Sequence, residues 1–235
     1  LIWEEIKQAF GLLAYGDSEI WAITWLSLKI SATATALSLL LGIPIGIMLA
    51  LSRFPGRSIT VALINTGMGL PPVVVGLFVS IFLWRSGPLG FLELLYTPTA
   101  MVLAQWVIAF PIVAGLTMAA FQSLNPQLSL QLLGSGASRL QLLWLLSKEA
   151  RLPLLAAVMA GFGGVISEVG ASMMVGGNIR GQTRVLTTAT VLETGKGNFE
   201  IAIALGLILL ILTFAVNFLL THIQQREQLR WPKPS

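Results

Sequence analysis

The chain has 235 residues, of which 55% are hydrophobic and only 10% are charged. Soluble domains carry about 25% charged residues, so this composition excludes a soluble domain and indicates an integral membrane protein. The absence of cysteine and the single histidine, His222, exclude a disulfide scaffold and a multi-histidine metal site. The net charge of +4 is interpreted through membrane topology rather than nucleic-acid binding, so no nucleic-acid partner is expected.

The apolar stretches are continuous rather than alternating, which predicts an all-α integral membrane fold. Residues 1–18 alternate apolar and charged side chains near a helical period and predict an interfacial helix. We expect a single transmembrane domain over residues 1–235, with about five transmembrane helices. The predicted spans lie near 21–51, 59–84, 97–121, 153–175 and 201–222.

Prolines fall inside three of these spans, where each removes a backbone hydrogen bond. Pro71 and Pro72 are adjacent and flanked by glycines, so they predict a broken helix that lines a translocation pathway or, alternatively, a kink that only shapes packing. Thr33 and Thr35 lie in a run of small residues that favours close helix packing, and their hydroxyls are also candidates for the pore.

Two polar segments separate the spans, residues 122–152 and residues 176–200. Lysine and arginine are enriched on cytoplasmic loops, which places 122–152 and the C-terminus in the cytoplasm and the N-terminus and 176–200 outside. The basic residues that decide this are Arg53, Arg57, Arg139, Lys148, Arg151, Arg226, Arg230 and Lys233.

No nucleotide-binding motif is present. A phosphate-binding loop needs G-x-x-x-x-G-K-[ST], and "TGKGN" (194–198) lacks that spacing. No nucleophile with a neighbouring base is evident either. The sequence therefore gives little support for an enzyme, and we expect no catalytic residues, metal or cofactor in the chain.

The segment "LLGSGASRLQLLWLLSKEARLP" (132–153) is an amphipathic arm suited to a groove on another protein, although an ordinary interfacial helix has the same composition. It resembles the cytoplasmic loop by which permeases of ABC importers dock on their ATP-hydrolysing subunit. Gly136 matches the family's glycine and Leu152-Pro153 match its end. The family's Glu-Ala-Ala is absent here, and the loop is about one helical turn longer.

The resemblance extends over nearly the whole chain. "SLKISATATALSLLLGIPIGIMLALSRFPGR", "GLPPVVVGLFVSIFLWRSGPLG" and "LAQWVIAFPIV" are similar to the first three spans of molybdate- and tungstate-type permeases. "ISEVGASMMVGGNIRGQTRVLTTATVLETGKGNFEIAIALG" is similar to their fourth span, outer loop and fifth span, and within this group its sequence most resembles tungstate uptake permeases.

This resemblance implies a MetI-like permease core in a prokaryotic cytoplasmic membrane. It implies a second copy of the chain, two ATP-binding cassette subunits that bind ATP and Mg, and an extracellular tungstate-binding protein. It also implies that residues near 133–144 transmit motion from the ATPase. The expected coupling residues are Leu133, Gly134, Gly136, Ala137, Ser138, Arg139 and Leu140.

Glu168 is a carboxylate within the fourth apolar stretch. An ionised carboxylate only accepts hydrogen bonds, so we interpret it as a structural or gate anchor rather than a ligand of an oxyanion, with Ser172 as a further pathway candidate. The outer segment that follows supplies candidates for docking the binding protein or attracting the anion: Asn178, Arg180, Thr183 and Arg184.

The sequence leaves several alternatives open. Arg180 and Arg184 are also candidates for lipid contacts or for ion pairs with Glu193 or Glu200. Residues 183–193 are apolar enough for a short helix that dips back toward the bilayer. Molybdate remains an alternative substrate, and an autonomous secondary transporter, a channel or a membrane scaffold remain alternative functions. No inhibition through an additional regulatory domain is expected.

Overall fold

A computed structural model of the chain describes residue 11 and residues 18–229, with side chains up to residue 226. The described part consists of helices and loops without strands. The interfacial helix predicted over 1–18 lies almost entirely outside it. The elements are α2 (Ser18–Leu51), α3 (Arg57–Met68), α4 (Pro72–Leu83), the 3-10 helix η1 (Gly90–Leu92), α5 (Pro98–Gln122), α6 (Pro126–Gly134), α7 (Arg139–Glu149), α8 (Arg151–Ile166), α9 (Gly170–Gly176), α10 (Leu186–Lys196) and α11 (Phe199–Leu229).

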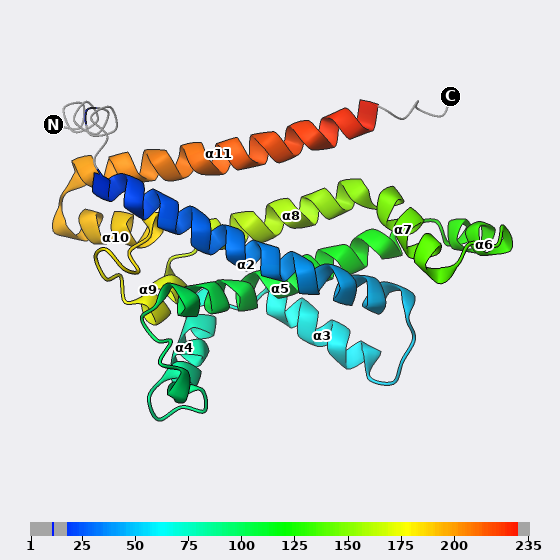
Figure 1. The fold of residues 1–235 in the computed structure, drawn as a ribbon, viewed down its shortest axis with the longest axis horizontal. Coiled ribbons are helices and arrows are strands. Elements are labelled where there is room, and N and C mark those ends of the chain that lie inside the picture. The colour runs from blue at the N-terminus through cyan, green and yellow to red at the C-terminus, as the bar shows by residue number, and fades with distance from the viewer. Residues whose placement is uncertain (1–10, 12–17, 230–235) are drawn as a thin grey trace.

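The long helices α2, α5, α8 and α11 run along the long axis of the molecule (Figure 1). The short helices α9 and α10 lie at one end, and α6 and α7 lie at the opposite end. Helix α4 projects away from this axis. The two polar segments of the sequence therefore mark opposite ends of one helical body.

Glycines let α2 and α5 approach closely. Gly42 and Gly46 are one turn apart on α2, and both are buried. A Cβ on Gly46 would lie 2.6 Å from the carbonyl oxygen of Ala114 on α5, and one on Gly42 would lie 2.9 Å from Val113. This small-xxx-small spacing allows backbone contact between helices in a membrane, and it makes α2 and α5 the central pair.

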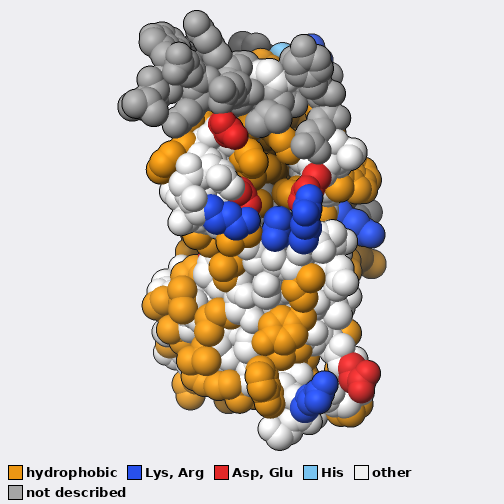
Figure 2. All heavy atoms as spheres, turned by 90° about the vertical axis from the view of Figure 1, so that its left-hand side faces the viewer, with side chains coloured by type: hydrophobic (Ala, Val, Ile, Leu, Met, Phe, Trp, Pro, Cys, Tyr) orange, Lys and Arg blue, Asp and Glu red, His pale blue; other side chains and the backbone are white. Residues whose placement is uncertain are grey.

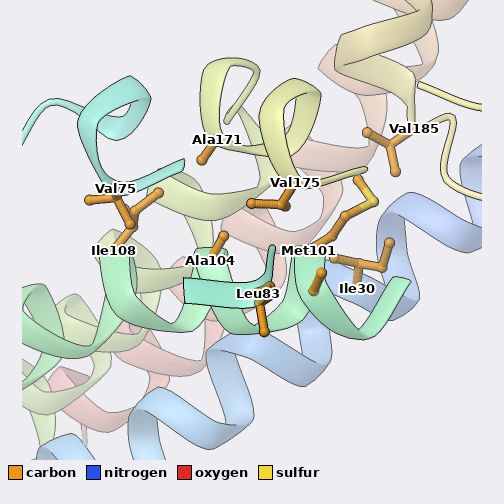
Figure 3. Packing of buried hydrophobic residues seen from close by; sticks show 10 residues of the cluster. Ile30, Val75, Leu83, Met101, Ala104, Ile108, Ala171, Val175 and Val185 are labelled. Carbon is orange, nitrogen blue, oxygen red and sulfur yellow. The ribbon is translucent and has the colours of Figure 1, made fainter. Parts of the chain in front are cut away.

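Buried apolar residues from distant segments meet between these helices. Figure 3 shows Ile30 from α2, Met101 and Ala104 from α5, Val75 from α4 and Val175 from α9 around one core. The short helix α9 thus packs into the centre of the molecule rather than against its surface.

Proline has different effects at different positions. Helices α2 and α5 continue through Pro44 and Pro111, whereas the predicted second span divides into α3 and α4, which are bent by 108°. Gly69, Leu70 and Pro71 occupy that bend, because Pro71 stands outside α4 and Pro72 opens it. The break predicted at the double proline is confirmed.

The fourth predicted span, 153–175, is two helices rather than one. Helix α8 ends at Ile166, and α9 begins at Gly170. Three described helices are long and apolar enough to cross a membrane, or up to five if each strongly bent pair is one span. The integral membrane class is therefore confirmed.

Candidate functional site

The two broken helices meet beside their breaks. A Cβ on Gly76 of α4 would lie 2.7 Å from the Cα atom of Ala171 on α9. A Cβ on Gly170 would lie 2.5 Å from Val73 on α4. The first turn of α4 after Pro71 therefore lies directly against the first turn of α9, and the pathway candidates Pro71, Pro72, Glu168 and Ser172 belong to one region of the fold.

Glu168 lies in the break between α8 and α9 and is buried, with 8% of its surface exposed. Its Oε1 accepts a hydrogen bond of 2.8 Å from the backbone N–H of Ala171, so the carboxylate satisfies a donor in the first turn of α9. Its carbonyl oxygen accepts from the Thr187 hydroxyl on α10 at 2.9 Å. The structure therefore places Glu168 as an anchor between three segments, although on an irregular turn rather than on the continuous helix that the sequence predicted.

Ser172 is part of a buried polar bridge across three helices. Gln105 of α5 donates from Nε2 to Ser172 Oγ of α9 at 3.3 Å, and Ser31 of α2 donates to Gln105 Oε1 at 3.4 Å. All three side chains are buried. Gln105 was not predicted from the sequence. The signal for it was a lone amide inside an otherwise apolar span, where a polar side chain needs a partner.

The two threonine candidates on α2 differ in environment. Thr35 is buried and donates to the carbonyl of Ser31 at 2.7 Å. Thr33 is exposed and donates to the carbonyl of Lys29 at 2.7 Å. Thr35 therefore has a packing role in this structure, whereas Thr33 lies on the outer surface of α2.

The start of the outer segment is fixed by side-chain hydrogen bonds. Asn178 has a φ of +52°, a left-handed conformation that asparagine tolerates, and its Nδ2 donates to the carbonyl of Thr188 on α10 at 3.3 Å. Thr183 is fully buried, donates to the carbonyl of Gly176 and accepts from the N–H of Ile179 at 3.0 Å. These two candidates close a turn and shape the loop from within.

Arg180 and Arg184 pair with the first turn of α2. Arg180 donates to both carboxylate oxygens of Glu19, with 2.7 Å from Nε to Oε1, and Arg184 Nη1 lies 3.7 Å from the same Oε1. Among the described residues, the acid that these two arginines contact most closely is therefore Glu19, and not Glu193 or Glu200, which the sequence had left as alternatives. Tertiary folding brings the distant Glu19 nearer than any acid of the same loop.

These arginines line a pocket of about 230 Å³ at the end of the molecule. Figure 2 looks onto this end and shows basic side chains gathered in a band beside acidic ones. Lys196 and Glu193 of α10 line the same pocket. Positive and negative groups alternate there, so the pocket is an ion-pair network rather than a purely cationic cage.

Glu193 accepts two side-chain hydrogen bonds in this network. Hydrogen bonds from Asn198 and Lys196 at 2.7 and 2.9 Å keep the pKa of the Glu193 carboxyl below its ordinary value, with a smaller electrostatic contribution from Arg184. Its side chain ties α10 to the loop before α11. Helix α10 largely coincides with the short helix that the sequence predicted within residues 183–193, and Thr188 and Ala189 on it are buried.

The coupling candidates lie at the opposite end, from Leu133 and Gly134 at the end of α6 to Arg139 and Leu140 at the start of α7. Gly136 has a φ of +83°, which explains a glycine at the turn. Ser138 caps α7 by accepting from the N–H of Gln141, whose side chain accepts from the Ser138 N–H at 2.8 Å. Ala137 is half-buried between them.

Large apolar side chains on this arm are exposed. Leu140 is 81% exposed and Trp144 is 63% exposed, and Lys148 lies over the Trp144 ring. Leu146 instead is buried against Phe121 of α5, so it holds the arm to the body.

Residues 42–228 match the protein family described as the binding-protein-dependent transport system inner membrane component. The chain belongs to this family. Membership implies the membrane, an ATPase subunit and a substrate-binding protein as partners, and confirms that the chain is a transport component rather than an enzyme. The family also agrees with the inner membrane of a prokaryote as its location.

Similar proteins span almost the same length. The chain is 41% identical to the tungstate uptake system permease protein TupB of Peptoclostridium acidaminophilum, covering 94% of this chain and 97% of that protein. It is 42% identical to a probable anion ABC transporter permease protein of Haloferax volcanii, covering 92% and 96%. It is 28% identical to the molybdenum transport system permease protein ModB of Escherichia coli K12, covering 82% and 91%.

The fold has a similar solved structure. The MetNI methionine ABC transporter in an inward-facing conformation contains a chain that superposes with a TM-score of 0.74 at 20% identity, covering 90% of this chain and 98% of that one. The predicted MetI-like fold is therefore confirmed.

Proposed function

We propose that this chain is the permease subunit of an ABC importer for tungstate. The observation that carries the proposal is the 41% identity with a tungstate uptake permease over nearly the full length of both chains. Two copies form the pathway, two ATPase subunits bind ATP and Mg, and an extracellular binding protein delivers the anion. The N-terminus lies outside and the C-terminus in the cytoplasm.

The exposed arm formed by α6 and α7 supports docking of an ATPase subunit. Leu140 and Trp144 present apolar surface at one end of the molecule, and an amphipathic helix of this kind fits a groove on a partner. The arm holds its own shape through the Ser138–Gln141 caps. It can therefore transmit a displacement as a rigid lever.

The broken helices support a pathway next to a second copy. Asn65 and Thr66 are exposed on α3 just before the bend at Gly69–Pro71. Polar groups at membrane depth face protein or water rather than lipid, which favours a second permease or the pathway itself beside the last turn of α3, beyond Ile59 and Leu63. We assign the region where α4 meets α9 to the gate, with Glu168 as its anchor.

The pathway releases its anion easily because it lacks a cationic cage. Between residues 60 and 121 the sequence contains no Lys or Arg except Arg85. Hydroxyls and backbone N–H groups stabilise an oxyanion without trapping it. The binding protein then captures the anion when its concentration is low.

Reconstituted vesicles test this function. The permease is inserted with its ATPase subunit, the binding protein is added outside with radioactive tungstate, and ATP is enclosed. We expect uptake that requires both partners and ATP. Uptake by the permease alone would instead establish an autonomous transporter or channel, and would contradict the proposal.

Molybdate is the second candidate, because the chain is also 28% identical to a molybdenum permease. Competition in the same vesicles distinguishes the two anions. Unlabelled tungstate should suppress uptake at lower concentration than molybdate or sulfate, and the reverse order would assign the system to molybdate.

A further inference from the structure

A second pocket, of about 520 Å³, lies near the end of the molecule that carries α6 and α7. Its walls come from the end of α2, the loop before α3, the end of α5 and the coupling arm. This volume is within the roughly 300–1,000 Å³ of small-ligand sites. We call it the basic pocket, because Arg53 and Arg57 line it.

The two arginines have no acidic partner in the part of the chain that the structure describes. Arg57 is half-buried and donates from Nε to the carbonyl of Leu49 at 2.8 Å, which fixes the side chain and leaves its two terminal nitrogens without a hydrogen bond there. Arg53 is exposed and lies in the loop four residues earlier. Two guanidinium groups beside one pocket without a counter-ion attract an anion, and phosphate oxygens match their planar donors.

The rest of the basic pocket combines the polar residues Ser52, Gln122 and Ser129 with apolar ones. Phe121 and Leu146 form part of its wall, and the exposed Leu51 lies at its edge. Beyond Arg57, α3 exposes Ile59 and Leu63, which are 68% and 66% exposed. A cationic site next to an exposed apolar helix has the chemistry of a lipid: a charged headgroup with acyl chains alongside it.

We propose that the basic pocket binds the phosphate headgroup of an anionic glycerophospholipid, with Arg53 and Arg57 as donors and the acyl chains along α3. Ser129 of α6 and Leu146 of α7 also line the pocket, so the bound lipid joins the α2–α3 loop to the coupling arm. Anionic lipid then raises the ATPase rate by holding that arm in place. The location of the pocket on the cytoplasmic side of the membrane depends on the orientation proposed above, whereas lipid binding itself does not.

Lipid binding is measured on the purified permease–ATPase complex in nanodiscs of phosphatidylcholine. Phosphatidylglycerol is titrated in, and the lipid retained on the complex is followed by native mass spectrometry. Each basic residue near an anionic lipid contributes roughly 1 kcal/mol, which is about fivefold in affinity. We expect Arg53→Gln to weaken retention about fivefold, and Arg53→Gln with Arg57→Gln to weaken it further.

Controls separate the pocket from general surface charge and from misfolding. Arg226→Gln removes an exposed charge from the end of α11 and should leave retention unchanged. Arg53 makes no hydrogen bond or ion pair within the described residues, so we expect Arg53→Gln to keep the fold even if loss of the Arg57–Leu49 bond destabilises the double variant. An equal loss in Arg226→Gln, or no loss in Arg53→Gln, would overturn the site.

Two further measurements fix the ligand and its effect. Inorganic phosphate and tungstate are added at millimolar concentration to complexes loaded with phosphatidylglycerol. Displacement by either ion would show a site for free tetrahedral oxyanions and overturn the lipid assignment. The ATPase rate should rise with phosphatidylglycerol in the wild type and not in Arg53→Gln, and this readout is independent of which anion is transported.

Discussion

The two ends of the molecule are built differently. The coupling arm, residues 122–152, is held by local caps such as Asn125 and the Ser138–Gln141 pair, and several of its large apolar side chains, including Leu140 and Trp144, are exposed. The outer region, residues 167–198, is held by hydrogen bonds between segments, and Thr183 and Thr188 are fully buried. The difference indicates that one end keeps surface for a partner while the other is completed within the chain.

This comparison has consequences for mutations. Changes to exposed side chains of the arm, such as Leu140, should affect partner binding without affecting stability, because these side chains are free of the core. Changes to buried groups of the outer region should affect stability first, because each of these groups loses a partner inside the fold.

Leu140→Asp should abolish most docking of the ATPase subunit while leaving the permease folded. A charge replaces an apolar side chain that is 81% exposed, and central apolar contacts of an interface typically contribute about 2 kcal/mol or more, or roughly thirtyfold in affinity. Affinity is measured by titrating the ATPase onto the purified permease. Lys148→Ala, on the same helix, is the matched control and should weaken ATPase binding less. A lowered melting temperature in Leu140→Asp would show that the arm also contributes to stability through this residue.

Gly76→Val should destabilise the outer region by about 1–3 kcal/mol, as overpacking does. Even a Cβ at this position would lie 2.7 Å from the Cα atom of Ala171, a backbone atom that cannot turn aside. Thermal unfolding in detergent measures the loss. Gly163→Ala on α8, where a Cβ meets nothing within 4 Å, should leave the melting temperature nearly unchanged.

Glu168→Leu should lower the free energy of unfolding by about 1 kcal/mol, because the N–H of Ala171 loses its acceptor. Glu168→Gln keeps an acceptor oxygen in the same place and should retain both the fold and most of the transport. The two variants are compared by thermal unfolding and by vesicle uptake. If Glu168→Gln changed which anion is transported, Glu168 would line the pathway rather than anchor the gate.

The stability of the outer region should depend weakly on acid. The pKa of Glu193 is lowered in the folded state by Asn198 and Lys196, so its stabilising contribution is complete above the ordinary carboxyl pKa and is lost as the pH falls through the lower folded value. The melting temperature should therefore fall less below about pH 4.5 in Glu193→Gln than in the wild type. An identical acid dependence in both would show that this network is not sensitive to protonation.

Sequence patterns predicted the helical class and the break at Pro71-Pro72, because each depends on neighbouring residues. Apolar length predicts a span, and proline ends a hydrogen-bonded ladder. The same local reasoning failed at residues 153–175. There α8 ends at Ile166 without a proline or a composition change, and the carbonyl of Glu168 accepts a hydrogen bond from Thr187 of α10.

What the sequence determined by itself was a membrane permease with an exposed arm and a polar outer segment, since composition and motif order are properties of the chain alone. Only the tertiary structure decided that Gln105 bridges Ser31 and Ser172, that Arg180 pairs with Glu19, and that Thr187 of α10 donates to the carbonyl of Glu168. Hydrogen bonds and ion pairs need partners within about 3–4 Å, and no spacing along the sequence states which distant helices come that close.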